Sequence, residues 1–116
     1  MDERILKWLF DIRAAIDEIE SFFEEYPKDF NQYKSNLILK RAVERDLEII
    51  GEAVNRIINQ NENFPIENAK RIIGLRNQII HAYDNISDES IWAILVKHIP
   101  LLKHEIKLLI ENSDNF

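Results

Sequence analysis

The sequence predicts an all-α protein, built as an antiparallel up-and-down four-helix bundle with one extra short helix. Apolar residues recur at steps of three and four over most of the chain, which is the pattern of amphipathic helices that bury one face. No stretch alternates apolar and polar residues as a half-buried strand does, and no Asn-Gly or Asp-Gly pair marks a β-hairpin. We therefore expect helices that pack around a single core.

The length of 116 residues fits one domain, residues 1–116, because a chain of this size buries enough surface for one core. The chain has no cysteine, which suits a reducing compartment and rules out disulfides and thiolate metal ligands. Its charged N-terminus lacks the apolar segment of a signal peptide, and no run approaches the ~20 apolar residues of a membrane span. We therefore expect a soluble, cytoplasmic protein.

Two long helices are expected in the first half of the chain. Residues 2–25 carry an apolar stripe that begins after a possible N-cap at Asp2 and stops before Pro27. Residues 28–34 are predicted to be a connection. A second helix then runs to about Gln60, where a polar stretch breaks the pattern.

Two glycines and a proline mark special positions in the middle of the chain. Gly51 costs a helix interior about 1 kcal/mol relative to alanine, so we expect it to let a neighbouring helix approach closely. Pro65 suits the first turn of a short helical piece. A longer helix then runs to about Tyr83, with Gly74 marking a bend or a close contact.

A final helix is expected over about residues 89–112, after a turn at residues 84–90. Ser87 or Asp88 can cap its first turn. Pro100 lies inside its apolar pattern and must kink or divide the helix, because proline lacks an N–H and clashes with the carbonyl four residues earlier.

Charge is unevenly distributed along the chain. The formal net charge of −6 argues against indiscriminate binding to nucleic acid, since phosphate backbones favour cationic surfaces. Residues 2–29 hold nine acidic and four basic side chains. Residues 70–83 hold only basic ones, at Lys70, Arg71 and Arg76. This cationic window is therefore the candidate region for contact with an anion.

The segment GLRNQIIHAY inside that window places four functional side chains within eight residues, at Arg76, Asn77, His81 and Tyr83. Each residue of an α-helix advances about 100°, so Arg76 and Tyr83 share one stripe. Asn77 and His81 form a second adjacent pair. His81 lies about 140° around the helix from Arg76. Either the helix ends near His81, or a second copy of the chain completes the site, as in a two-fold dimer.

Arginine, histidine and tyrosine without metal ligands suit the cleavage of RNA phosphodiesters. The imidazole of His81 can take a proton from a ribose 2′-hydroxyl or give one to the leaving 5′-oxygen. The guanidinium of Arg76 can bind two phosphate oxygens and stabilise the charge of the transition state. Tyr83 can stack on a base or hydrogen-bond a phosphate, and Asn77 can orient His81 or the phosphate.

Structural roles are open for the same types of side chain. An arginine near a helix end most often forms a surface ion pair, a histidine beside an apolar face usually belongs to the core, and a tyrosine usually packs its ring. Direct RNA contact is a possible role for Lys70, Arg71 and Arg45. His98 and His104 are six residues apart and do not match a helical metal motif, so no metal site is predicted.

The order arginine, asparagine, three residues, histidine, one residue, tyrosine resembles the signature of the HEPN superfamily and, within it, of the HepT-like toxins. Arg76, Asn77, His81 and Tyr83 stand at those positions. The stretch KRAVERDLEIIGEAVNRI at residues 40–57 and a final helix with an internal proline also resemble that family. The resemblance covers nearly the whole chain.

This resemblance implies a metal-independent endoribonuclease without a cofactor, which is the toxin of a toxin–antitoxin pair. It also implies a homodimer, or a higher oligomer built from such dimers, with a composite site at the subunit interface and Arg76 and His81 as the catalytic pair. The partner would be an MntA-type nucleotidyltransferase antitoxin that transfers AMP from ATP to Tyr83. Each adenylyl group would add bulk and negative charge where RNA phosphates bind.

Three hypotheses from different functional classes follow. The chain is a ribonuclease toxin, a HEPN-type module that binds nucleotide or RNA without cutting it, or a helical dimerisation module in which Arg76 and His81 only bridge two subunits. A nuclease assay with the His81→Ala variant separates the first from the other two. RNA binding without cleavage selects the second.

Overall fold

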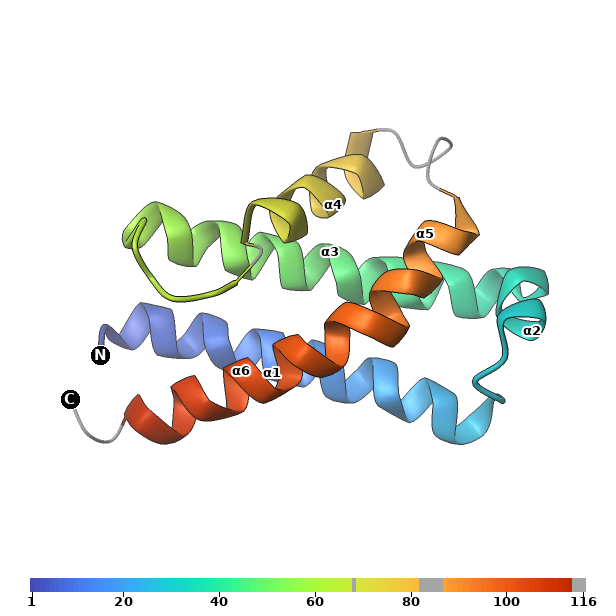
Figure 1. The fold of residues 1–116 in the computed structure, drawn as a ribbon, viewed down its shortest axis with the longest axis horizontal. Helices are drawn as coiled ribbons and strands as arrows, with labels where there is room; N and C mark the ends of the chain where they lie inside the picture. The colour runs from blue at the N-terminus through green and yellow to red at the C-terminus, as the bar shows by residue number, and fades with distance from the viewer. Residues whose placement is uncertain (68, 82–86, 114–116) are drawn as a thin grey trace.

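A computed structural model describes residues 1–67, 69–81 and 87–113 of the chain (Figure 1). Its helical elements are α1 (Glu3–Glu25), α2 (Phe30–Ser35), α3 (Leu37–Gln60), α4 (Ala69–His81), α5 (Asp88–Ala93), a π-helical turn (Ile94–His98) and α6 (Ile99–Asn112). Within the described residues all regular structure is helical, which confirms the predicted all-α class. No helix in these ranges is both long and apolar enough to cross a lipid bilayer.

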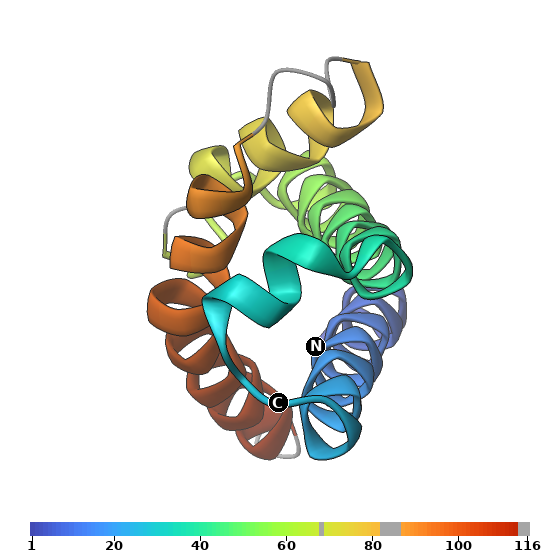
Figure 2. The same ribbon diagram turned by 90° about the vertical axis from the view of Figure 1, so that its right-hand side faces the viewer.

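The long helices alternate in direction. Figure 1 shows α1 leading away from the end where the chain begins, α3 returning beside it, α4 leading out again, and α5 and α6 returning. The end-on view in Figure 2 shows them arranged around a shared interior. The most extensive packing joins α1 to α3 and α3 to α4, and α6 lies against α1. This arrangement is the antiparallel bundle that the periodicity predicts.

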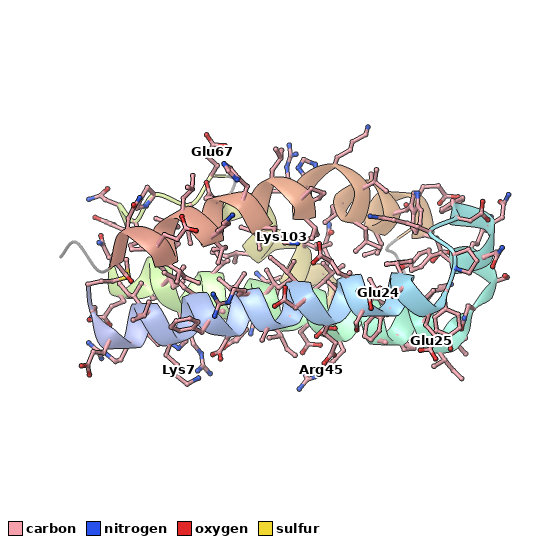
Figure 3. All side chains as sticks on the ribbon, turned by 90° about the horizontal axis from the view of Figure 1, so that it is seen from below. Lys7, Glu24, Glu25, Arg45, Glu67 and Lys103 are labelled. Atoms are coloured by element: carbon pink, nitrogen blue, oxygen red, sulfur yellow. The ribbon has the colours of Figure 1, made fainter. Side chains whose placement is uncertain are left out.

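The core consists of apolar side chains from each long helical run, and the charged side chains labelled in Figure 3 lie on the outside. Full burial of one such aliphatic side chain contributes about 1.5–3 kcal/mol. The predicted stripes of the first two long helices supply the centre of this core, with 1 % exposure or less at Leu9, Ile12, Ile16, Val43, Ile50, Val54 and Ile57. The core therefore places α1 and α4 against α3, and α6 against α1.

One carboxyl is buried between α1 and α3. Asp46 is only 2 % exposed, and its Oδ2 has no hydrogen-bond partner among the described residues. Burial, with a hydrogen bond to the neighbouring Glu18 carboxyl, raises the pKa of Asp46 to about 7. The α1–α3 interface therefore holds a buried carboxyl beside Glu18, a feature that the apolar stripe of α3 does not predict.

The short helix lies at a different place from the predicted one. Phe30–Ser35 forms α2, where the sequence predicts a connection, because Asp29 caps its first turn and Tyr33 is fully buried. After Pro65 the described backbone is not helical, with no regular structure at residue 66 and a turn at residue 67. The predicted short helical piece at this position is therefore wrong.

The final helix is divided near Pro100, as the sequence predicts. α5 begins after Ser87, whose Oγ accepts a hydrogen bond from the N–H of Ser90 at 3.1 Å. The π-helical turn follows, in which the N–H of Ile99 bonds to the carbonyl of Ile94. Because Pro100 cannot donate a hydrogen bond, this wider turn just before it accommodates the irregularity.

Candidate active site between α3 and α4

Gly51 sets how closely α4 approaches α3. A Cβ at this position would overlap the Cβ of Arg76, lie 2.8 Å from its Cγ and lie 3.2 Å from the carbonyl oxygen of Ile72. The predicted close approach at Gly51 is therefore confirmed, and α4 reaches this position because Gly51 has no side chain. Gly74 has no neighbour within 4 Å of a Cβ position and lies inside one continuous helix. The bend or close contact predicted at Gly74 is therefore wrong.

The contact with Gly51 holds the stem of Arg76 against α3, and polar contacts hold its guanidinium. Its Nη2 forms an ion pair with Oε2 of Glu52, and its Nη1 donates a 2.8 Å hydrogen bond to Oδ1 of Asn77. Its Nε is buried and has no acceptor among the described residues. The side chain is 23 % exposed. Asn77 therefore orients Arg76, whereas the sequence suggests that it orients His81 or a phosphate.

The guanidinium of Arg76 faces an open groove, which we call the Arg76 groove. It is lined by side chains of α1, α3 and α4, namely Trp8, Asp11, Arg45, Glu48, Ile49, Glu52, Ala53, Arg56 and Arg76. These include three arginines and three carboxylates, so the positive charges of the groove are balanced by fixed acids before any ligand binds. An anion that enters must therefore compete with carboxylates for the guanidinium groups.

The arginines of the groove are paired on the α3 side. Arg45 lies 3.8 Å from Glu48 between Nη1 and Oε1, and Arg56 donates from Nε to Oε1 of Glu52 at 3.1 Å. Glu52 thus contacts both Arg56 and Arg76. The structure therefore brings Arg45 and Arg76, two of the predicted site residues, into one groove. It adds Arg56, which the i, i+4 spacing from Glu52 along the same face of α3 could have identified.

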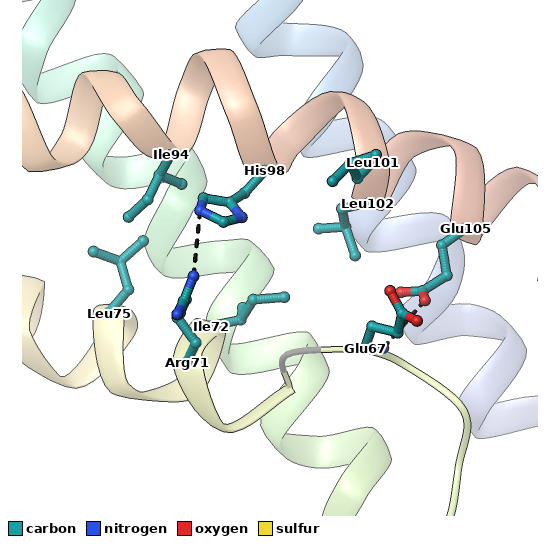
Figure 4. Close-up of a pocket in the computed structure, with 9 residues that line it drawn as sticks. All are labelled: Glu67, Arg71, Ile72, Leu75, Ile94, His98, Leu101, Leu102 and Glu105. Atoms are coloured by element: carbon teal, nitrogen blue, oxygen red, sulfur yellow. Dashed lines mark hydrogen bonds between the residues drawn. The ribbon is translucent and has the colours of Figure 1, made fainter.

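Arg71 lies on a different side of α4. It lines a second pocket, between α4 and the π-helical turn with α6 (Figure 4), and its Nη1 is 3.4 Å from Nε2 of His98. The walls of this pocket are mostly apolar, with Leu75 and Leu102 among them, and Glu105 stands near its other end. The basic residues of the cationic window therefore do not all converge on one site.

Three of the predicted site residues fall wholly or partly outside the described structure. The backbone of His81 ends α4, and the backbone of Lys70 lies in its first turn, but neither side chain is described. Tyr83 lies outside the described residues. Because α4 is one helix through His81, its backbone places His81 about 140° around from Arg76.

The described side chains of the groove include guanidinium groups that can bind an anion but no imidazole. A guanidinium keeps its proton at neutral pH, so Arg76 can bind and stabilise a phosphate without transferring a proton. Among the described residues no group of three or more histidine, aspartate and glutamate side chains could hold a metal ion. The described lining of the groove therefore supplies anion binding, and the imidazole of His81 is not part of it.

Comparison with known proteins identifies the family. A family model described as "Ribonuclease HepT-like" matches residues 12–109. A protein of Methanocaldococcus jannaschii named "Putative RNase MJ1380" is 36 % identical over 112 residues, which cover 94 % of this chain and 100 % of that protein. "Probable ribonuclease HepT" of Thermococcus cleftensis is 34 % identical over 103 residues, which cover 88 % and 92 % of the two chains. No solved structure matches the chain. The chain therefore belongs to the HepT-like ribonuclease family of HEPN proteins, as its arginine-to-tyrosine motif predicts.

Proposed function

We propose that the chain is a metal-independent endoribonuclease and the toxin of a toxin–antitoxin pair. The observation that carries this proposal is the placement of Arg76, whose guanidinium is held at a solvent-facing groove by Gly51, Glu52 and Asn77. Membership of a ribonuclease family supports RNA as the substrate. A pre-positioned guanidinium is suited to a phosphate, because its N–H groups match two phosphate oxygens.

Cleavage would proceed by attack of the ribose 2′-oxygen on phosphorus. The imidazole of His81 would take the proton from the 2′-hydroxyl, the 2′-oxygen would form a bond to phosphorus, and the bond to the 5′-oxygen would break. A protonated imidazole would then supply the proton that the leaving 5′-oxygen needs. Arg76 would stabilise the additional negative charge on the phosphate oxygens. Guanidinium and imidazole therefore have separate roles and both are required.

A homodimer would bring the two groups together. Arg76 and His81 lie about 140° apart around α4, so one straight helix does not direct both at the same phosphate. Two copies of α4 related by a two-fold axis would place Arg76 of one copy near His81 of the other. The proposed site is therefore composite, and each subunit would contribute to two equivalent sites.

We expect purified protein to cleave RNA in the presence of EDTA, and we expect the His81→Ala variant to lose this activity. Loss of a general acid–base group typically lowers the rate about 10²–10⁴-fold. The measurement is the rate of cleavage of an end-labelled RNA under single-turnover conditions. Thermal melting of both proteins provides the control for folding.

Equal rates for wild-type and His81→Ala protein would contradict this assignment. The ion pair of Arg76 with Glu52 is also what a purely structural arginine would form, so a non-catalytic module is the second candidate. RNA binding by both proteins without cleavage by either would favour that module.

The proposed antitoxin is an MntA-type nucleotidyltransferase that modifies Tyr83. The phenol oxygen of Tyr83 would form a bond to the α-phosphorus of ATP, pyrophosphate would leave, and the phenol proton would be released. The product would carry an added nucleotide and a negative charge beside the segment that holds Arg76 and His81. Repulsion of RNA phosphates would then lower activity.

We expect the mass of the intact protein to increase by one or more adenylyl groups after incubation with the antitoxin and ATP. The Tyr83→Phe variant should show no such increase, because the acceptor hydroxyl is missing. Intact-mass spectrometry measures both proteins directly. Full modification of Tyr83→Phe would disprove this acceptor site.

A further inference from the structure

Glu52 binds two arginines at once, each through a different oxygen. Its Oε2 pairs with Nη2 of Arg76, and its Oε1 accepts a 3.1 Å hydrogen bond from Nε of Arg56. Arg56 lies one turn further along α3, whereas Arg76 comes from α4. Glu52 is therefore the link between a guanidinium on its own helix and the proposed catalytic guanidinium.

The two partners of Glu52 differ in their exposure to solvent. The side chain of Arg56 is 56 % exposed, that of Glu52 is 35 % exposed and that of Arg76 is 23 % exposed. Exposed ion pairs are weak, at about 0–1 kcal/mol, because water screens both charges. Arg56 is therefore the more exposed of the two partners, and its long side chain can stay with the Glu52 carboxylate if that carboxylate leaves Arg76.

An RNA phosphate that binds Arg76 at Nη2, where Glu52 now lies, takes the place of the Glu52 carboxylate. Without another cation, the released carboxylate would stay beside the incoming phosphate, and two negative charges at such short range repel each other. The remaining pair with Arg56 lowers this penalty, because Glu52 keeps a guanidinium partner at its other oxygen, Oε1.

We propose that Arg56 is a positioning residue that holds Glu52 when an RNA phosphate displaces it from Arg76. This inference rests on the proposed function, because it takes RNA as the ligand of the Arg76 groove. It assigns a role to a residue that lines the groove but is absent from the arginine-to-tyrosine motif. Arg56 acts through Glu52 and does not itself contact the phosphate.

A simpler role for Arg56 would be direct contact with a second phosphate, since it lines the same groove. The two roles differ in their dependence on Glu52. If Arg56 acts through Glu52, its removal has no effect once the carboxylate is replaced by a neutral amide. If Arg56 contacts RNA itself, its removal weakens binding whether or not the carboxylate is present.

The test uses wild-type protein and the Arg56→Ala, Glu52→Gln and double variants. Each is titrated with a short RNA whose 2′-hydroxyls are methylated, so that binding is measured without cleavage, at one fixed salt concentration. We expect Arg56→Ala to raise Kd about three- to fivefold in the wild-type background. In the Glu52→Gln background the same change should leave Kd within about twofold. Arg56→Lys, which keeps the positive charge, should restore most of the affinity.

Kinetics with cleavable RNA supply a readout that a merely structural role would not produce. Arg56→Ala should raise KM and leave kcat and the melting temperature nearly unchanged. An unchanged Kd in Arg56→Ala, or an equal rise in both backgrounds, would overturn the proposal. The predicted binding pattern without any cleavage would support the role of Arg56 and contradict the proposed nuclease function. Absence of RNA binding by the wild-type protein would overturn both.

Discussion

Replacing Arg76 with alanine is expected to abolish RNA cleavage while the fold remains intact. The guanidinium is held at the groove by Glu52 and Asn77, so it is oriented before a phosphate arrives. Removal of one such pre-positioned donor typically lowers kcat by about 10²–10³-fold. The apolar core does not depend on the guanidinium, because the buried aliphatic side chains come from other positions.

An Arg76→Lys variant separates charge from geometry. Lysine keeps the positive charge but loses the planar pair of N–H groups that can bind two phosphate oxygens. We expect cleavage by this variant to be intermediate between wild-type and Arg76→Ala. Single-turnover rates in EDTA and melting curves measured on the same preparations test both variants. A wild-type rate in a folded Arg76→Ala protein would remove Arg76 from the mechanism.

Replacing Gly51 with alanine should destabilise the protein, which is the opposite of the usual effect. Inside a helix this change normally stabilises by about 1 kcal/mol. Here the new methyl group would overlap the side chain of Arg76, and overpacking of this kind typically costs about 1–3 kcal/mol. The strain would move α4 away from α3 and carry Arg76 out of its position. We therefore expect cleavage to fall together with stability.

Gly74→Ala is the matched control for this prediction. Gly74 also lies inside a helix, but a Cβ there meets nothing within 4 Å. This variant should gain about 0.5–1 kcal/mol from the better helix propensity of alanine. Urea denaturation of both variants measures the two free energies of unfolding. Equal stability changes at the two glycines would show that α4 does not require Gly51.

Much of the fold could be predicted because the relevant signals are local. The spacing of apolar residues predicts α1 and α3, and Pro100 predicts the division of the final helix. The unfavourable helix propensity of glycine at position 51 predicts a closely packed neighbouring helix. The position of α2 could not be predicted in this way, since it depends on the burial of Tyr33 against other elements. The burial of Asp46 could not be predicted either, because the neighbouring carboxyl, Glu18, is on another helix.

The candidate site could be predicted only in part. The motif identifies Arg76 from sequence alone, but its pairing with Glu52 joins two helices and follows from the tertiary packing. The positive charge of residues 70–83 suggests one cationic surface, whereas Arg71 and Arg76 face different sides of α4. A spacing of five residues places them about 140° apart, so helix geometry explains why they separate.

If the groove on the α3 side of α4 cleaves RNA, the two arginines of α4 should differ sharply in their effect on activity. One labelled RNA is incubated in EDTA with wild-type, Arg76→Ala and Arg71→Ala protein under identical conditions. We predict that Arg76→Ala shows no cleavage above background. The side chain of Arg71 is directed toward His98, so we predict that Arg71→Ala stays within about threefold of wild type. Activity that survives in Arg76→Ala and is lost in Arg71→Ala would contradict the account and place the active site on the α6 side.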